Sequence, residues 1–145
     1  MKKTATQRLK SKSKQSKRTL HKKVWDVFSK CVRLRAITDN EYVQCFTCSA
    51  VKKWTEMQAG HFKHGKLDFD PLNIHPQCQQ CNGFKHGKLD VYGIKLAQTY
   101  GLKTVIDLEK RAAQHEGYSY SELENLLKLF TEEFEFLTAL KLWRS

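Results

Sequence analysis

The chain has 145 residues, of which 26 are Lys or Arg and 15 are Asp or Glu, giving a formal net charge of +11. This length fits one compact domain with extensions rather than two full domains, and a hydrophobic content of 40% permits a core. No apolar stretch approaches the length of a membrane span, so we expect no membrane partner.

The positive charge is concentrated at the N-terminus. Residues 1–23 hold ten of the Lys and Arg residues and no acid, whereas residues 24–145 are almost neutral. Residues 1–20 are therefore predicted to be a basic arm, disordered in isolation because it has little apolar surface to bury. Such lysines bind polyanions by releasing counterions from phosphates, although a solubilising tail has the same composition. The arm indicates nucleic acid without saying which kind.

The rest of the chain predicts an α+β protein that is rich in helices. Apolar residues at helical spacing predict a first helix over 21–35, with these residues turned inward: Val24, Phe28, Cys31 and Leu34. Cys31 is interpreted as an ordinary buried thiol. Short strands are then expected over 42–46, 51–54 and 57–62. A Gly- and Lys-rich loop over 64–71 and a helical segment over 78–85 follow.

Three more helices are expected at the C-terminal end, over 91–100, 104–114 and 121–142. Gly101 is predicted to end the first of them, and Ser121 with Glu124 to cap the last. The inward residues of the first are expected to be Val91, Ile94, Leu96 and Ala97. The last helix carries a wide apolar stripe, which either packs on the domain or pairs two copies of the chain. The expected division is an arm (1–20), a core (21–103) and a helical extension (104–145) whose excess of acids should face away from DNA.

Two Cys-x2-Cys pairs, Cys45 with Cys48 and Cys78 with Cys81, predict a structural Zn²⁺ site. Four thiolates in two knuckles complete the tetrahedron that zinc takes when its role is structural. Disulfides are the alternative, but a lysine-rich start without a hydrophobic signal segment argues against secretion. A redox motif would sit in a βαβ pattern, and the paired knuckles favour zinc over an iron–sulfur cluster.

His61, Asn73 and Asn82 lie in or directly after the segment between these pairs. Hydrolysis of a phosphodiester needs a general base and a divalent cation near the leaving oxygen. We interpret His61 as the base, Asn73 as the residue that holds its ring, and Asn82 as a ligand of Mg²⁺ or Mn²⁺. The sequence Lys-His-Gly-Lys-Leu-Asp occurs at 63–68 and again at 85–90. Chance similarity explains it, but it supplies lysines for DNA contacts at Lys63, Lys66, Lys85 and Lys88.

These motifs resemble a known group of enzymes. The order Cys-x2-Cys, Gly-His-hydrophobe, Asn-hydrophobe, Cys-x2-Cys-Asn-x2-Lys is similar to the His-Asn-His (HNH) nucleases with a ββα-metal core. Over residues 45–101 the chain more closely resembles the NinG (Rap) recombination endonucleases of lambdoid phages, and in plan the phage resolvase endonuclease VII. The residues that carry the resemblance are Ala59-Gly60-His61-Phe62, Asn73-Ile74-His75, Gln77-Cys78, Cys81-Asn82, Lys85 and Tyr92.

The resemblance implies a zinc-stapled fold with His61 as base and Asn82 as metal ligand, acting on branched recombination intermediates in the cytoplasm of a bacterial host. Many HNH nucleases have an aspartate before the catalytic histidine as second metal ligand, where this chain has Gly60. The second ligand is left open, between waters with phosphate and four side chains: His64, Asp68, Asp70 and His75.

Two other functions stay open at this point. One is a non-catalytic zinc module that binds DNA or RNA through its basic arm. The other is a sequence-specific HNH homing or restriction nuclease, which would need a base-reading element that the sequence does not obviously contain. The set of His61, Asn73 and Asn82 favours the nuclease over the binding module, because a binding module has no need of it.

Overall fold

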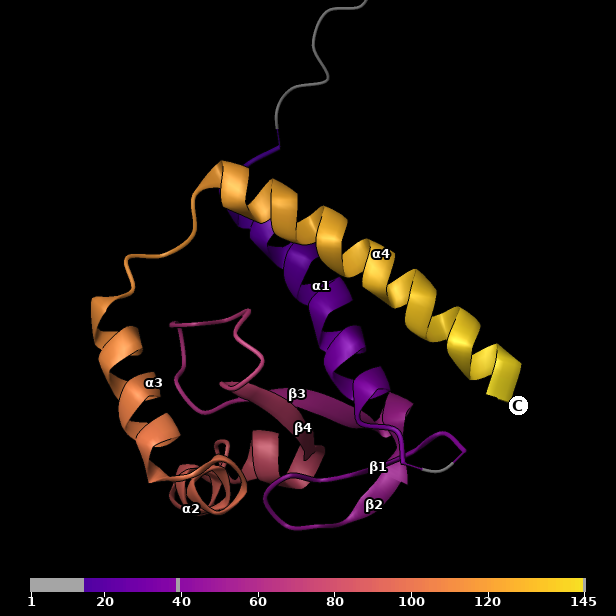
Figure 1. The fold of residues 1–145 in the computed structure, drawn as a ribbon, viewed down its shortest axis with the longest axis vertical. Helices are drawn as coiled ribbons and strands as arrows, with labels where there is room; N and C mark the ends of the chain where they lie inside the picture. Colours follow the sequence, from indigo (N-terminus) through magenta and orange to yellow (C-terminus); the bar gives the residue numbers. More distant parts are fainter. Residues whose placement is uncertain (1–14, 39, 145) are drawn as a thin grey trace, which may run out of the picture.

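A computed structural model describes residues 15–38 and 40–144 (Figure 1). Most of the expected basic arm, residues 1–14, lies outside the described residues. The elements in chain order are α1 (Lys17–Arg35), β1 (Tyr42–Gln44), β2 (Val51–Lys53), η2 (Trp54–Glu56), β3 (Met57–His61), β4 (Ile74–Cys78), η3 (Gln80–Phe84), α2 (Leu89–Tyr100), α3 (Leu102–Gln114) and α4 (Tyr120–Arg144). The protein is therefore α+β and rich in helices, as the sequence predicts.

The first helix begins earlier than its apolar spacing indicates. Ser16 caps α1 by accepting the N–H of Thr19 at 3.1 Å, and Leu20 is only 1% exposed. Residues 17–20, expected in the arm, therefore belong to the helix. The side chain of Ser16 satisfies a backbone N–H of the first turn, so the helix can begin before its first apolar residue at helical spacing. The four predicted inward residues are buried, and burial raises the pKa of the Cys31 thiol to about 11.

Helix α1 lies between α4 and the hairpin of β3 and β4 (Figure 1). One cluster of apolar side chains joins all three layers: it includes Val24 and Phe28 of α1, Ala59 of β3, Ile74 of β4 and Phe130 of α4. Strands β3 and β4 pair antiparallel, with His61 opposite Ile74 and Met57 opposite Cys78. Because α1 packs on both strands, it fixes the position of one face of this hairpin.

Strand β4 is not among the expected elements. The sequence predicts strand, loop and then helix, yet residues 74–78 pair with β3 along their full length. Every residue of β4 is buried, so the strand lacks the alternation of apolar and polar residues that reveals a half-exposed strand. Pro76 also argues against a strand, but it pairs with Ala59. The helical segment expected over 78–85 is a single π-helical turn, η3.

The capping residue of the last helix lies two residues before the predicted one. Ser119 accepts the N–H of Glu122 at 3.1 Å and donates its own N–H to the Glu122 carboxylate at 2.6 Å. The capping box is thus formed by Ser119 and Glu122 rather than by Ser121 and Glu124. Both pairs fit the capping pattern. Packing favours the pair of Ser119 and Glu122, because Tyr118 and the fully buried Leu123 then pack on the core as a hydrophobic staple.

Helices α2 and α3 form a separate layer around Tyr92, Leu96 and Leu108 (Figure 1). Gly101 ends α2 with a φ of +92°, as predicted. The expected inward position of Ile94 is wrong, since its side chain is 58% exposed. Tyr92 occupies the core instead, because its hydroxyl finds the Gly60 carbonyl at 2.8 Å.

Candidate functional site

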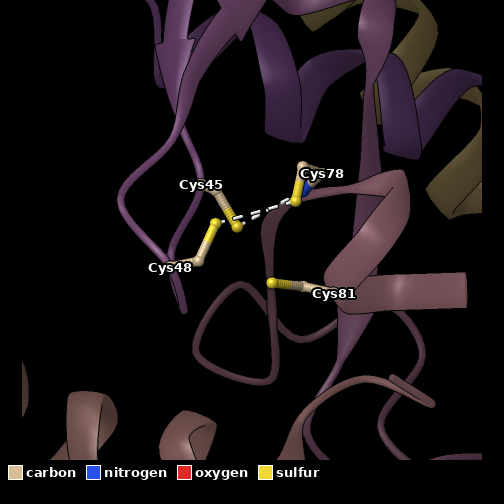
Figure 2. A group of neighbouring side chains, drawn as sticks. All are labelled: Cys45, Cys48, Cys78 and Cys81. Atoms are coloured by element: carbon tan, nitrogen blue, oxygen red, sulfur yellow. Dashed lines mark hydrogen bonds between the residues drawn. The ribbon is translucent and has the colours of Figure 1, made fainter. Parts of the chain in front are cut away.

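The four paired cysteines converge at one point (Figure 2). Cys45 and Cys48 lie on the turn after β1, Cys78 ends β4, and Cys81 lies in η3. Their sulfur atoms all lie within 4.8 Å of one another, and those of Cys48 and Cys78 are 3.7 Å apart. Four thiolates about 2.3 Å from a tetrahedral zinc ion lie roughly 3.8 Å apart. The cysteines can therefore bind a structural metal such as zinc.

The surroundings of Cys45 favour the thiolate that zinc requires. All five cysteines are free of disulfides. Burial opposes ionisation of Cys45, but hydrogen bonds from the Thr47 hydroxyl and from backbone N–H groups outweigh it and lower the pKa to about 6. One of these donors is the N–H of Cys78, 3.3 Å from the Cys45 sulfur. The second knuckle thus stabilises the charge of Cys45, whereas burial raises the pKa of Cys48 and that of Cys81.

A cleft of about 460 Å³ runs between α1 and β3, with η3 at its side. Helix α1 contributes three side chains spaced four residues apart, which share one helix face. Strand β3 and η3 contribute the two residues that the sequence singles out, His61 and Asn82. The complete lining is Trp25, Ser29, Arg33, Met57, Gln58, Ala59, His61, His64 and Asn82.

His61 ends β3 and is held from two sides. Its ring stacks on Trp25, with 4.6 Å between centroids and 17° between planes, and its Nε2 lies 3.3 Å from Oδ1 of Asp68. The other oxygen of Asp68 is 3.0 Å from Nε2 of His21. The hydrogen bond with His61 outweighs burial and keeps the pKa of Asp68 below its usual range. A carboxylate at Nε2 fixes the tautomer, which makes Nδ1 the nitrogen available as a base.

Asn73 does not hold the His61 ring as predicted. Its Oδ1 accepts the N–H of Lys63 at 2.8 Å, and its Nδ2 donates to the carbonyls of Lys63, Lys66 and Leu67, each at 3.1 Å. The fully buried amide therefore closes the loop between β3 and β4 on itself. Asp68 lies within this loop, so Asn73 acts on His61 only by fixing the backbone that carries Asp68.

Asn82 lies in η3, next to the buried Cys81. Its Nδ2 donates to Oε1 of Gln58 at 2.8 Å, which fixes the amide against β3. An amide nitrogen only donates, so the amide oxygen is the atom that can bind a cation, and the bond to Gln58 fixes the orientation of the amide. The structure thus brings Asn82 and His61 to one cleft.

The four candidates for a second metal ligand differ in their position relative to the cleft. His64 lines the cleft, and its ring centroid is 5.3 Å from that of His61. Burial, with the nearby His61, lowers the pKa of His64. Asp68 faces His61 as described. Asp70 is paired with Arg111. His75 is buried between the hydroxyls of Tyr92 and Tyr100, at 3.0 and 3.2 Å, and burial lowers its pKa to about 4.

Gly60 has a steric reason to lack a side chain. A Cβ built on it would lie 1.8 Å from Oε1 of Gln77. Gln77 is fully buried and cannot move aside, because its Nε2 donates to Oγ1 of Thr47 at 3.1 Å and to the carbonyl of Gly87 at 2.8 Å. The aspartate that many HNH nucleases carry before the histidine therefore does not fit at this position.

The four predicted DNA-binding lysines fall into two pairs. Lys63 forms an ion pair with Glu109 at 2.5 Å, and Lys66 donates to the carbonyl of His115 at 2.9 Å. Both are thus engaged within the protein. Lys85 is exposed and Lys88 half-buried, in the second copy of the repeat. The two copies adjoin, since a Cβ on Gly87 would lie 3.6 Å from Nε2 of His64.

No residue of α1 was predicted from the sequence to have a function, although three of them line the cleft. Trp25, Ser29 and Arg33 recur at intervals of four beside the buried face of the helix. Their spacing is the sequence feature that could have indicated a shared face. Residues beside the buried face of a helix are usually exposed to solvent, however, so the spacing alone does not indicate a functional cleft.

Comparisons with known proteins support one family. The family model described as Bacteriophage Lambda NinG protein matches residues 1–138, which is nearly the whole chain. A search of the curated proteins and a search of the solved structures each found no match. Among the described residues, no helix combines the length and apolarity that crossing a bilayer requires. The chain therefore belongs to the NinG family of bacteriophage lambda, a phage recombination family.

Proposed function

We propose that this protein is an endonuclease that cuts branched recombination intermediates of DNA, such as Holliday junctions and D-loops, by metal-dependent hydrolysis of a phosphodiester. The observation that carries the proposal is the meeting of His61 and Asn82 in one cleft beside the cysteine cluster. Membership of a phage recombination family supports branched DNA as the substrate.

In this proposal His61 is the general base. Its Nδ1 takes the proton of the attacking water, while Asp68 at Nε2 stabilises the imidazolium that forms. Trp25 restricts the tilt of the ring by stacking on one face. Because Trp25 and Asp68 already fix the ring, little conformational entropy is lost when His61 takes the proton.

The amide oxygen of Asn82 would hold Mg²⁺ or Mn²⁺, and His64 is the side chain best placed to join it in the cleft. When bound, such a cation supplies positive charge beside the leaving oxygen. Water and substrate phosphate would complete the coordination, since Mg²⁺ keeps much of its hydration. The order β3, β4, η3 supports the proposal of a ββα-metal core of the HNH type, with the π-helical turn η3 in the place of its helix.

The proposed partners are DNA and a second copy of the chain. The basic N-terminal segment and the exposed Lys85 supply positive charge for DNA. On α4, Leu129, Phe136 and Trp143 recur every seven residues and are exposed, while the opposite face of the helix packs on α1. Exposed apolar side chains gathered along one helix face are typical of a surface that contacts another protein, so we propose that this face joins two protomers.

The experiment that tests the activity compares a four-way junction, a flap and a linear duplex in Mg²⁺ and in EDTA. His61→Ala should bind the junction but cut it roughly two to four orders of magnitude more slowly, the usual contribution of a positioned base. Asn82→Ala should recover as Mg²⁺ or Mn²⁺ is raised, because its defect lies in metal occupancy. His115→Ala is the control, since His115 lies outside the cleft lining.

Near-normal cleavage by a folded His61→Ala protein would refute this mechanism. A wild-type protein that binds junctions but cuts nothing in either metal would instead support a non-catalytic zinc module. Preferred cutting of one duplex sequence would favour a homing or restriction nuclease.

A further inference from the structure

The cleft contains a positive charge, Arg33, that pairs with no acidic side chain within residues 15–38 and 40–144. Arg33, near the end of α1, lines the cleft and is half-buried. Its Nε donates to the carbonyl of Ser29 at 2.9 Å, and its Nη1 lies 3.2 Å from the carbonyl oxygen of Met57 and 3.4 Å from that of Trp54. The guanidinium also lies over the Trp54 ring, 5.4 Å from its centroid. These contacts hold the group in one position.

None of these partners is a carboxylate. Elsewhere in the described residues, Arg35 pairs with Glu133, and Arg111 pairs with both Asp70 and Asp107. A partly buried charge that meets only neutral acceptors is costly, and burial lowers the pKa of Arg33. Its bonds engage Nε and Nη1, whereas Nη2 makes no hydrogen bond to any residue that the structure describes. An anion in the cleft would supply the missing partner.

We propose that Arg33 binds a phosphate group of the DNA strand that enters the cleft. The proposal rests on the proposed function only in taking DNA as the ligand. Nη2 carries two N–H groups that can donate to phosphate oxygens in a charge-assisted bond, and Arg33 lines the same cleft as His61 and Asn82. A phosphate bound by Arg33 therefore lies beside the base and the cation ligand. This makes α1 a substrate-binding element as well as the support of the hairpin.

Arg33 also has a structural role, because its bonds to Met57 and Trp54 tie α1 to β3 and η2. Two substitutions separate the roles. Arg33→Gln keeps an N–H donor for these carbonyls but removes the charge, whereas Arg33→Lys keeps the charge and loses the fork. Arg144→Gln removes an equal charge from the exposed end of α4 and serves as the control.

The first measurement is junction binding in EDTA, over a series of salt concentrations. Arg33→Gln should bind about tenfold more weakly, as expected for a lost charge-assisted bond. The slope of log affinity against log salt should fall by about 0.9, the value of one phosphate contact on duplex DNA. Arg33→Lys should keep the slope with an intermediate affinity, and Arg144→Gln should match wild type. A folded Arg33→Gln protein with unchanged affinity and slope would overturn the proposal.

The second measurement locates the contact. Single phosphates around the branch point are replaced in turn by neutral methylphosphonates, and binding by wild type and Arg33→Gln is compared. At one position the replacement should weaken wild type but not the variant, since the variant has already lost that contact. If every replacement weakens both proteins equally, Arg33 binds no phosphate. Should Arg33→Gln fail to fold, judged by thermal unfolding, Arg33→Lys takes its place in this cycle. Because lysine keeps the charge but loses the planar donor group, the replacement at one position should weaken Arg33→Lys less than wild type, and equal weakening at every position would overturn the proposal.

Both measurements exclude cleavage, so they are independent of the proposed activity. A protein that binds through Arg33 yet cuts nothing in Mg²⁺ would refute the nuclease and leave the phosphate site standing. A wild-type protein that cuts in Mg²⁺, with an Arg33→Gln variant that binds the junction as wild type does, would refute the phosphate site and leave the nuclease standing.

Discussion

At residue 60, the backbone of β3 passes against the buried Gln77 amide, with no space for a side chain. Gly60→Ala should therefore lower the free energy of unfolding by about 2 kcal/mol or more, the usual cost of overpacking a core. Gly60→Asp, which introduces the aspartate that many HNH nucleases carry at this position, should lower the free energy of unfolding further. Gly83→Ala is the matched control, because a Cβ there meets only Gln79 at 4.0 Å. Urea unfolding of the four proteins measures the difference, and equal stabilities would contradict the steric explanation.

Asp68 predicts a pH dependence of stability. The hydrogen bond with His61 keeps its folded-state pKa below the unfolded value, so the carboxylate contributes stability that is fully present above about pH 4 and lost as the pH falls through the folded pKa. Asp68→Asn lacks this contribution. The stability gap between wild type and Asp68→Asn should therefore be open near neutral pH and close in acid. Unfolding curves from about pH 7 to pH 2 test this, and a constant gap would mean that ionisation of Asp68 is irrelevant.

At the scale of elements, α4 has two faces with different roles. Phe130 is buried against α1, so Phe130→Ala should cost about 3 kcal/mol or more of stability. Phe136 is 65% exposed, so Phe136→Ala should change the stability of the fold by no more than about 0.5 kcal/mol. Denaturant unfolding under conditions where the protein is monomeric compares the two. Equal losses of stability in the two variants would mean that α4 does not pack on α1 through the face that carries Phe130.

The exposed face of α4 can be tested by oligomeric state. We expect the wild type to sediment as a dimer and the double variant Phe136→Ser, Trp143→Ser as a folded monomer, because the proposed contact residues are removed from a face that the fold does not need. Wild type that stays monomeric up to about 100 μM, well above the micromolar Kd of a modest interface, would exclude this pairing.

At the scale of the whole molecule, the cysteine cluster links β1, β4 and η3. Replacing Cys45, Cys48, Cys78 or Cys81 by Ser should unfold the centre of the protein, because zinc-binding energy is folding energy in small modules. Cys31→Ser should be tolerated, since a hydroxyl can replace the thiol that donates to the Phe130 carbonyl at 3.4 Å. Circular dichroism and metal analysis check this. Less than about half an equivalent of zinc in the wild type would contradict the four-ligand site.

The sequence by itself determined the features that depend on local spacing. The Cys-x2-Cys pairs predict the metal cluster, because two residues between cysteines let both sulfurs reach one ion. The apolar spacing of Val24, Phe28, Cys31 and Leu34 predicts α1, and Gly101 predicts the end of α2, because helix faces and left-handed caps are local properties. His61 and Asn82 were also singled out from sequence, although what they do is still a proposal.

Only the tertiary structure decided which groups meet across distant parts of the chain. Asp68 rather than Asn73 contacts His61, because the loop that Asn73 closes turns the carboxylate toward the ring. Strand β4 forms because α1 and β3 bury it, which no pattern within β4 reveals. Gly60 is required by Gln77, seventeen residues further along the chain. Arg33 reaches the cleft because α1 packs across β3. Each of these features depends on a contact between two segments that are distant in the chain, and the pattern within one segment does not identify the other.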